Sequence, residues 1–213
     1  MTTEGPAGLF LVFEGVEGAG KTTHLRRLSR RLDDAGIAHL VVREPGATVA
    51  GESVRRIVLD PASELHAETE LLLILAARAE FVRRIVAPAL ARGELVLADR
   101  YELSTLAYQG AGRGLGVERV RALNAFATGG LKPAGTVLLQ VESLAGRGRK
   151  VGAADRMERE DDGFHARVAE AYAHLAASEP HVIPIDSAAR PDEVHARIWG
   201  ELSRRWPERF PPA

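Results

Sequence analysis

The chain has 213 residues, a formal net charge of −1 and no cysteine. This length suits one α/β domain, and the near-neutral charge gives no electrostatic reason to expect binding to nucleic acid or to a membrane. The lack of cysteine excludes disulfides and thiol chemistry. The sequence has no apolar run near the roughly 20 residues that span a bilayer and no basic start typical of a signal peptide, so we expect a cytoplasmic protein.

The first predicted element is a buried strand over Leu9–Glu14, which leads into a glycine-rich loop. Residues 15–22 have the sequence G-V-E-G-A-G-K-T, which fits the pattern G-x-x-x-x-G-K-[ST] of phosphate-binding loops. The next segment has leucines at 25, 28 and 32, a spacing typical of a helix. Strand, loop and helix form the context that this motif requires, so we favour phosphate binding over a glycine-rich turn that binds nothing.

The residue types in this loop explain the chemistry that we expect from it. Glycine adopts backbone angles that other residues avoid, which lets backbone N–H groups surround a polyphosphate. Lys21 is expected to reach the β- and γ-phosphates, and Thr22 is expected to bring its hydroxyl to Mg²⁺. The predicted ATP-binding residues are Gly15, Val16, Glu17, Gly18, Ala19, Gly20, Lys21, Thr22 and Thr23.

Four further apolar runs predict strands, and helical patterns fill the intervals between them. The runs are His39–Arg43, Leu95–Asp99, Thr136–Val141 and Val182–Asp186. This alternation predicts a three-layer α/β/α fold, with a five-stranded parallel sheet covered by helices on both faces. A long apolar helical region is expected from about Glu64 to Ala91. We see no linker, so residues 1–213 are expected to form a single domain, and the tail over 207–213 is expected to fray.

Two of the predicted strands lead into candidate binding segments. Asp99 and Arg100 end the third strand, and ligands of open parallel sheets bind beyond the carboxyl ends of the strands. Asp99 could hold Mg²⁺ there, and the planar guanidinium of Arg100 could bind a phosphate, although such a pair could also only cap the next helix. Residues 43–48, R-E-P-G-A-T, predict a fixed turn at the same edge, or else a plain connecting loop.

Two glycine-containing segments later in the chain are also candidates. Residues 108–115, Y-Q-G-A-G-R-G-L, contain too many glycines for a helix interior. We therefore expect a loop there that offers polar groups to a small ligand, or a flexible surface loop. Residues 147–152, R-G-R-K-V-G, are basic and could form a lid over about 145–156 that supplies arginines to a transition state. Charge alone favours the alternative, a solvated loop.

Together these segments resemble the thymidylate kinase family, whose members phosphorylate dTMP to dTDP with ATP. The resemblance runs from about Leu9 to Leu202, and it implies the fold of the P-loop nucleoside monophosphate kinases. It also implies ATP and dTMP as ligands, Mg²⁺ as cofactor and a homodimer. The matching segments, in the order of the family, are Glu14–Thr23, Arg43–Thr48, Asp99–Gln109, Gly110–Leu115 and Asp155–Val168.

The resemblance implies roles for individual residues. Arg100 would hold the dTMP phosphate, and Arg78 would hold the phosphate or the edge of the base. Thr105 would hydrogen-bond the thymine ring, Tyr108 would lie against the deoxyribose, and Glu17 would face the 3′-hydroxyl. The implied substrate-binding set is Glu17, Pro45, Ile74, Arg78, Arg100, Thr105, Tyr108 and Gln109. The implied metal ligands are Thr22 and Asp99, and the implied catalytic residues are Lys21, Arg100 and the lid arginines Arg147 and Arg149.

Three departures from the family pattern limit these implications. Ile74 stands where the family commonly has a phenylalanine that stacks on thymine, and isoleucine cannot stack as a ring does, so we predict weaker or less selective base binding. The fourth strand lacks two common aspartates, and the segment over 140–155 is about two residues short, which leaves the identity of the catalytic lid arginine open. The alternatives are a kinase that prefers dUMP or another monophosphate, and a homologue that binds nucleotide without kinase activity.

Overall fold

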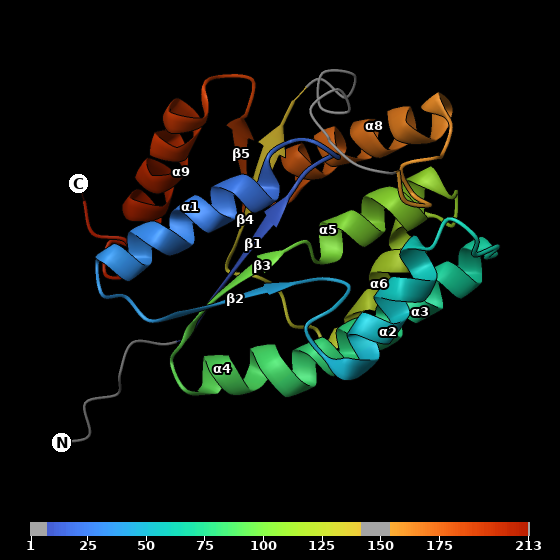
Figure 1. Ribbon diagram of the computed structural model, residues 1–213, viewed down its shortest axis with the longest axis horizontal. Coiled ribbons are helices and arrows are strands. Elements are labelled where there is room, and N and C mark those ends of the chain that lie inside the picture. The colour runs from blue at the N-terminus through green and yellow to red at the C-terminus, as the bar shows by residue number, and fades with distance from the viewer. Residues whose placement is uncertain (1–7, 142–153, 213) are drawn as a thin grey trace.

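The computed structural model describes residues 8–141 and 154–212. At its centre is a sheet of five parallel strands in the order β2-β3-β1-β4-β5, with helices on both faces (Figure 1). This confirms the predicted three-layer α/β/α architecture. The strands are β1 (Leu9–Glu14), β2 (His39–Arg43), β3 (Leu95–Asp99), β4 (Gly135–Gln140) and β5 (Val182–Asp186). All five lie where the apolar runs predicted them, within one residue.

The alternation of side chains along β1 divides the core between the two faces of the sheet. Leu9, Leu11 and Phe13 pack with the leucines of α1 (Lys21–Asp34) and the apolar face of α9 (Pro191–Arg205). Phe10 and Val12 point to the opposite face, where they pack with Phe81 and Val86. Burying both faces of the sheet removes a large apolar area from water, which is the main driving force for this fold.

The second face is covered by the middle of the chain. The long helical region begins at Ala67, and a π-helical stretch joins its two parts. Its neighbour α2 (Val49–Leu59) packs against α3 (Ala67–Phe81), and α3 packs against α6 (Val117–Thr128). The elements of this layer are α2 (Val49–Leu59), α3 (Ala67–Phe81), η1 (Val82–Val86), α4 (Ala87–Ala91), α5 (Glu102–Thr105), η2 (Leu106–Gly112), α6 (Val117–Thr128) and α8 (Asp162–Ser178).

The prediction of a loop at residues 108–115 is wrong for residues 108–112, because the π-helix η2 continues to Gly112. Two of its glycines, Gly110 and Gly112, lie where neighbouring helices approach closely. A Cβ atom on Gly112 would lie 2.7 Å from the ring of Phe164 in α8, and one on Gly110 would lie 3.1 Å from the Cα of Val117 in α6. The close approach of two neighbouring helices therefore overrides the low helix propensity of glycine.

The C-terminal tail also differs from the expectation that it frays. Phe210 is completely buried, and its ring lies edge-on to Trp199 of α9 with the ring centroids 5.8 Å apart. The indole N–H of Trp199 donates to the carbonyl oxygen of Pro211 at 3.1 Å. Burial of one large aromatic side chain is enough to hold a segment that has little tendency to form a helix.

The topology gathers the predicted binding segments at one edge of the sheet. In the register of the sheet, Asp99 is the partner of Phe13 in β1 and of Arg43 in β2. The loops that follow these three strands therefore start side by side. Among the helices of the described residues, none is long and apolar enough to cross a membrane.

Candidate functional site

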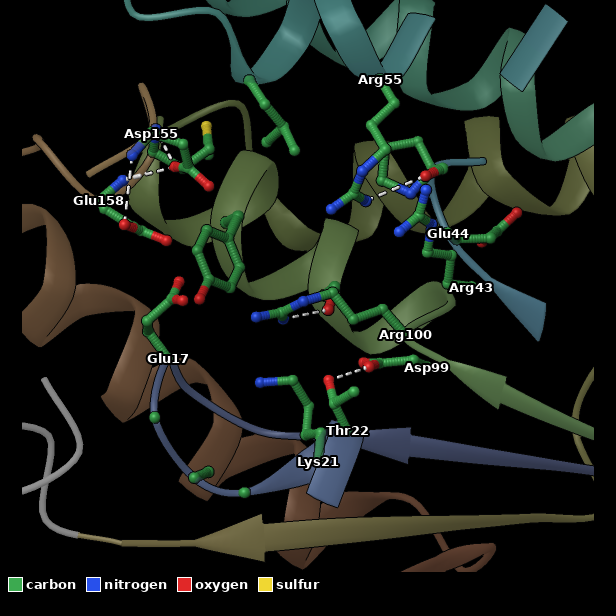
Figure 2. A pocket seen from close by; sticks show the side chains of 18 of the residues that line it. Glu17, Lys21, Thr22, Arg43, Glu44, Arg55, Asp99, Arg100, Asp155 and Glu158 are labelled. Atoms are coloured by element: carbon green, nitrogen blue, oxygen red, sulfur yellow. Dashed lines mark hydrogen bonds between the residues drawn. The ribbon is translucent and has the colours of Figure 1, made fainter. Parts of the chain in front are cut away.

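A cavity of about 1160 Å³ opens at this edge of the sheet (Figure 2). Its walls come from the loops after β1, β2 and β3, from α2, α3 and η2, and from residues 155–158. Arg147 and Arg149 lie outside the described residues. The cavity brings together most of the other predicted site residues, namely Glu17, Gly18, Ala19, Gly20, Lys21, Thr22, Thr23, Pro45, Ile74, Arg78, Asp99, Arg100, Thr105, Tyr108 and Gln109.

The loop after β1 is shaped by its glycines and closed by Lys21. Gly15 has a φ of 139°, and a Cβ atom there would lie 2.5 Å from the carbonyl oxygen of Leu139, so only glycine fits. The ammonium group of Lys21 donates to the carbonyl oxygens of Gly15 at 3.0 Å and Val16 at 2.8 Å. These two predicted residues therefore hold Lys21 through their carbonyls, although they do not line the cavity. α1 begins at Lys21, so its N-terminus faces the same space, an arrangement that favours phosphate.

The electrostatic environment of Lys21 is unusual for a lysine. Burial, together with the nearby positive charge of Arg100, lowers the pKa of Lys21 to about 7. A buried ammonium group favours a negatively charged ligand that restores its charge balance. The loop is therefore prepared for an anion by its backbone geometry and by this one side chain.

Thr22 and Asp99 form a direct contact between α1 and β3. The hydroxyl of Thr22 donates to Oδ2 of Asp99 at 2.7 Å. Both groups offer the hard oxygen atoms that Mg²⁺ prefers. Within residues 8–141 and 154–212, no three acidic, histidine or cysteine side chains gather as a metal site. A divalent ion at this pair would therefore take its remaining ligands from water or from phosphate oxygens.

Arg100 adopts a backbone conformation that is uncommon for a residue with a side chain. Its φ is 74°, and its backbone N–H donates to the carbonyl oxygen of Phe13 at 3.0 Å. Its guanidinium group donates to Ser104 at 2.8 Å and to the carbonyl oxygen of Gly15 at 3.3 Å. Figure 2 shows this group above Lys21 and Thr22. Strained backbone of this kind is often found at functional sites, and here it turns a second cation toward the phosphate loop.

Glu14 is a supporting residue whose role the sequence analysis missed. It is completely buried, and its carboxylate accepts hydrogen bonds from the backbone N–H groups of Tyr101 at 2.8 Å and Ser104 at 3.0 Å. The hydroxyls of Ser104 and Tyr172 donate to its second oxygen at 2.6 and 2.9 Å. Glu14 therefore fixes the segment that follows Arg100. The available signal was an acidic residue at the end of an otherwise apolar strand.

The opposite end of the cavity contains a buried ion pair. Arg78 is 2% exposed, and its Nε donates to Oε2 of Glu44 at 2.7 Å. Its two terminal nitrogens donate to Oδ1 of Asn124 at 2.7 Å and to the carbonyl oxygen of Tyr101 at 2.8 Å. A guanidinium group carries five N–H donors, so this network fixes the orientation of Arg78 and leaves two donors.

A second buried network surrounds Glu70 of α3. Gln109 donates to Oε1 of Glu70 at 2.6 Å, Arg113 donates to Oε2 at 3.0 Å, and Arg156 also donates to Oε2. Burial opposes ionisation of this carboxyl, yet the hydrogen bonds from Arg113, Gln109 and Arg156 bring the pKa of Glu70 below its usual value. Because Arg156 also donates to the carbonyl oxygen of Val58 at 2.8 Å, residues 155–158 are fixed beside the cavity. The sequence analysis missed this network.

Further lining residues also escaped the sequence analysis. The guanidinium group of Arg55 extends from α2 into the cavity (Figure 2), and it donates to the carbonyl oxygen of Pro45 at 3.1 Å. The apolar side chains that line the cavity include Ile74, Val58, Leu59 and Met157. Among the described residues that line the cavity, the aromatic rings are those of Tyr108 and His24. Other lining residues lie outside the predicted site set, although several belong to segments that the sequence analysis singled out; they are Arg26, Arg43, Glu44, Ser104, Asp155, Glu158, Ser187, Ala189 and Pro191.

Comparison with known proteins gives a consistent result. The family model described as thymidylate kinase matches residues 13–198. A thymidylate kinase of Deinococcus radiodurans is 50% identical over 201 residues, which cover 93% of this chain and 98% of that protein. Thymidylate kinases of a Synechococcus strain and of Symbiobacterium thermophilum are 46% and 40% identical, over 93% and 95% of this chain and 96% of each relative.

Proposed function

The chain belongs to the thymidylate kinase family, and we propose that it phosphorylates dTMP to dTDP by direct transfer of the γ-phosphoryl group of ATP within this cavity. The main support for this proposal is the position of Arg100, whose guanidinium lies 3.3 Å from the carbonyl oxygen of Gly15 in the phosphate loop. Two cationic groups, from Lys21 and Arg100, thus face one space at the edge of the sheet. Such an arrangement suits two phosphates that must meet.

Phosphoryl transfer requires mainly alignment and neutralisation of charge. A phosphate oxygen of dTMP attacks the γ-phosphorus in line, the bond between the γ-phosphorus and its bridging oxygen breaks, and ADP leaves. The backbone N–H groups of residues 15–22 hold the ATP phosphates, and Lys21 contacts the group in transfer. Arg100 holds the dTMP phosphate, so that both cations stabilise the developing negative charge.

We assign Mg²⁺ to the oxygen atoms of Thr22 and Asp99, which lie in direct contact and have the chemistry that this ion requires. When bound, the ion neutralises negative charge on the ATP phosphates. The contact between Thr22 and Asp99 positions these oxygens beside the phosphate loop.

The deoxynucleoside of dTMP is assigned to the end of the cavity beyond Arg100. Thr105 hydrogen-bonds the thymine ring, Pro45, Ile74 and Gln109 line its pocket, and Arg78 offers its remaining donors to a base oxygen. Tyr108 lies against the deoxyribose, where a 2′-hydroxyl would be crowded, and Glu17 faces the 3′-hydroxyl. We add Arg55 to the groups that approach the dTMP phosphate, because Figure 2 shows its guanidinium directed into the cavity.

Kinase assays with a panel of monophosphates test the acceptor. ADP production is measured with dTMP, dUMP, dCMP and dGMP at saturating ATP, and we expect the highest kcat/KM for dTMP. A higher value for dUMP would favour the alternative of a shifted base preference, which is motivated by the isoleucine at residue 74. No ADP production with any monophosphate would favour the non-catalytic homologue.

We also propose that the protein is a cytoplasmic homodimer. Phe126 of α6 is 83% exposed and Leu72 of α3 is 60% exposed. Since α3 and α6 pack on each other, a second copy could cover both side chains and remove apolar surface from water. Sedimentation of the native protein and of a Phe126→Glu variant tests this, and we expect the substitution to shift a dimer toward monomer.

A further inference from the structure

The buried carboxylate of Glu70 fixes the orientation of one amide in the cavity wall. Gln109 is 2% exposed, and its Nε2 donates to Oε1 of Glu70 at 2.6 Å. An ionised carboxylate can only accept hydrogen bonds. The amide nitrogen of Gln109 must therefore face Glu70, and its oxygen must point elsewhere.

The amide oxygen of Gln109 is left for a ligand. Gln109 lines the cavity, and its Oε1 accepts no hydrogen bond from the described residues. The wall of the base pocket therefore presents a hydrogen-bond acceptor at this position.

An acceptor at this position distinguishes two classes of pyrimidine. Thymine and uracil carry an N–H donor at N3, whereas neutral cytosine has an acceptor nitrogen at N3. We propose that Glu70 is a positioning residue that makes the site select bases with a donor at N3, because it turns the carbonyl oxygen of Gln109 toward the ligand. This inference rests on the proposed function and deepens it, since it names how the base is selected.

The two arginines at Glu70 determine what the Glu70→Gln substitution does. Arg113 and Arg156 both donate to Oε2 of Glu70, and Nε of Arg113 also makes a longer contact of 3.3 Å with Oε1. We expect a glutamine at residue 70 to keep its carbonyl oxygen at the Oε2 position, because an amide nitrogen there would oppose a donor from each arginine. At the Oε1 position the amide nitrogen opposes one arginine donor only, Nε of Arg113. Its amide nitrogen then faces Gln109, whose own amide must turn over. The nitrogen of Gln109 would now face the cavity, where it opposes a donor at N3 and suits an acceptor.

The test compares the binding of dTMP and dCMP by the wild-type protein and the Glu70→Gln variant, with each Kd measured by calorimetry. We expect the preference for dTMP over dCMP to fall by about 10- to 100-fold in the variant, because an unmatched buried donor costs about 1–3 kcal/mol. An unchanged ratio of the two Kd values would overturn the proposal. Using a ratio cancels general weakening of the pocket and any loss of the lid contact made by Arg156.

Two controls separate positioning from a general structural role. Glu160 also pairs with Arg113, at 2.6 Å, and no hydrogen bond joins its carboxylate to Gln109. The Glu160→Gln variant should therefore keep the wild-type ratio. In a Gln109→Leu background, Glu70→Gln should have no further effect on the ratio. A change in that background would show that Glu70 acts by another route, and would also overturn the proposal.

Folding of each variant is measured before its Kd values are compared. If Glu70→Gln fails to fold, the Glu70→Gln and Arg113→Gln double variant restores the charge balance and keeps Arg156 on the carbonyl oxygen, so the same reduced ratio is expected. Kinase activity of the wild-type protein with dTMP is assayed separately. Lack of that activity would reject the proposed function, whereas normal activity with an unchanged ratio in the variants would reject only the role of Glu70.

Discussion

The two ends of the cavity are built in different ways. At the phosphate end, the groups that face the ligand come from residues 15–22, Asp99 and Arg100, and backbone geometry positions most of them. At the base end, partners distant in the sequence hold the side chains, as Glu44 and Asn124 hold Arg78 and as Glu70 holds Gln109. In the proposed function, phosphate binding is therefore a local property of the chain, and base selection depends on tertiary pairing.

This difference has an energetic consequence. The Arg78–Glu44 pair is buried, with both side chains 3% exposed, and removal of one member of such a pair costs about 3–5 kcal/mol. Substitutions at the base end therefore disturb folding and recognition together. We expect substitutions of cations at the phosphate end to act mainly on the transition state.

The largest expected effect comes from Lys21→Ala, which isolates the phosphate end. It removes the ammonium group that contacts the group in transfer, and we expect kcat to fall about a thousandfold, with the Kd for dTMP little changed. Steady-state kinetics and calorimetry measure the two quantities. Lys132→Ala, which removes an exposed lysine, is the matched control. Near-normal turnover by Lys21→Ala would reject the assignment of this loop.

The next largest effect is expected from the lid arginines, Arg147 and Arg149. If one of them stabilises the transition state, its alanine variant should lower kcat about a hundredfold or more and change the Kd for dTMP little. Lys150→Ala, a neighbouring cation in the same basic segment, should have a smaller effect. Normal turnover in both arginine variants would show that neither lid arginine acts beside Lys21 and Arg100. Arg55 would then be the first candidate for this further cation.

The same contrast explains what the sequence could and could not predict. The strands and the glycine loop follow local rules, namely buried apolar runs and a glycine pattern before a helix. The positions of the strands and the strand–loop–helix arrangement were confirmed, and phosphate binding by the loop stays a prediction. Gly110 is explained only by its close approach to Val117, and Gly112 only by its close approach to Phe164. The buried tail depends on contact with Trp199. Glu70 has no local signature at all, because its role comes from three partners 39 to 86 residues away.

Ile74→Phe tests whether the base end lacks a stacking ring. Ile74 lines the cavity and offers no ring, and stacking of a base on an aromatic side chain is worth about 1–3 kcal/mol. We expect the Kd for dTMP to fall about tenfold, with the Kd for ATP unchanged. Ile74→Leu, which adds no ring, should leave both values near those of the wild-type protein. Weaker dTMP binding by the phenylalanine variant would instead show that the pocket is already filled.

The smallest effect is a proton taken up when MgATP binds, and it belongs to the phosphate end alone. Burial and the charge of Arg100 lower the pKa of Lys21 to about 7 in the free protein, whereas phosphate charge favours the ammonium form. Binding at pH 8 should therefore take up a proton, and affinity should fall about fivefold from pH 7 to pH 8 as the free protein loses that proton. Calorimetry in buffers of different ionisation enthalpy measures the uptake. Lys21→Arg keeps its charge throughout this range and should show no uptake; equal uptake by both proteins would assign the proton to another group.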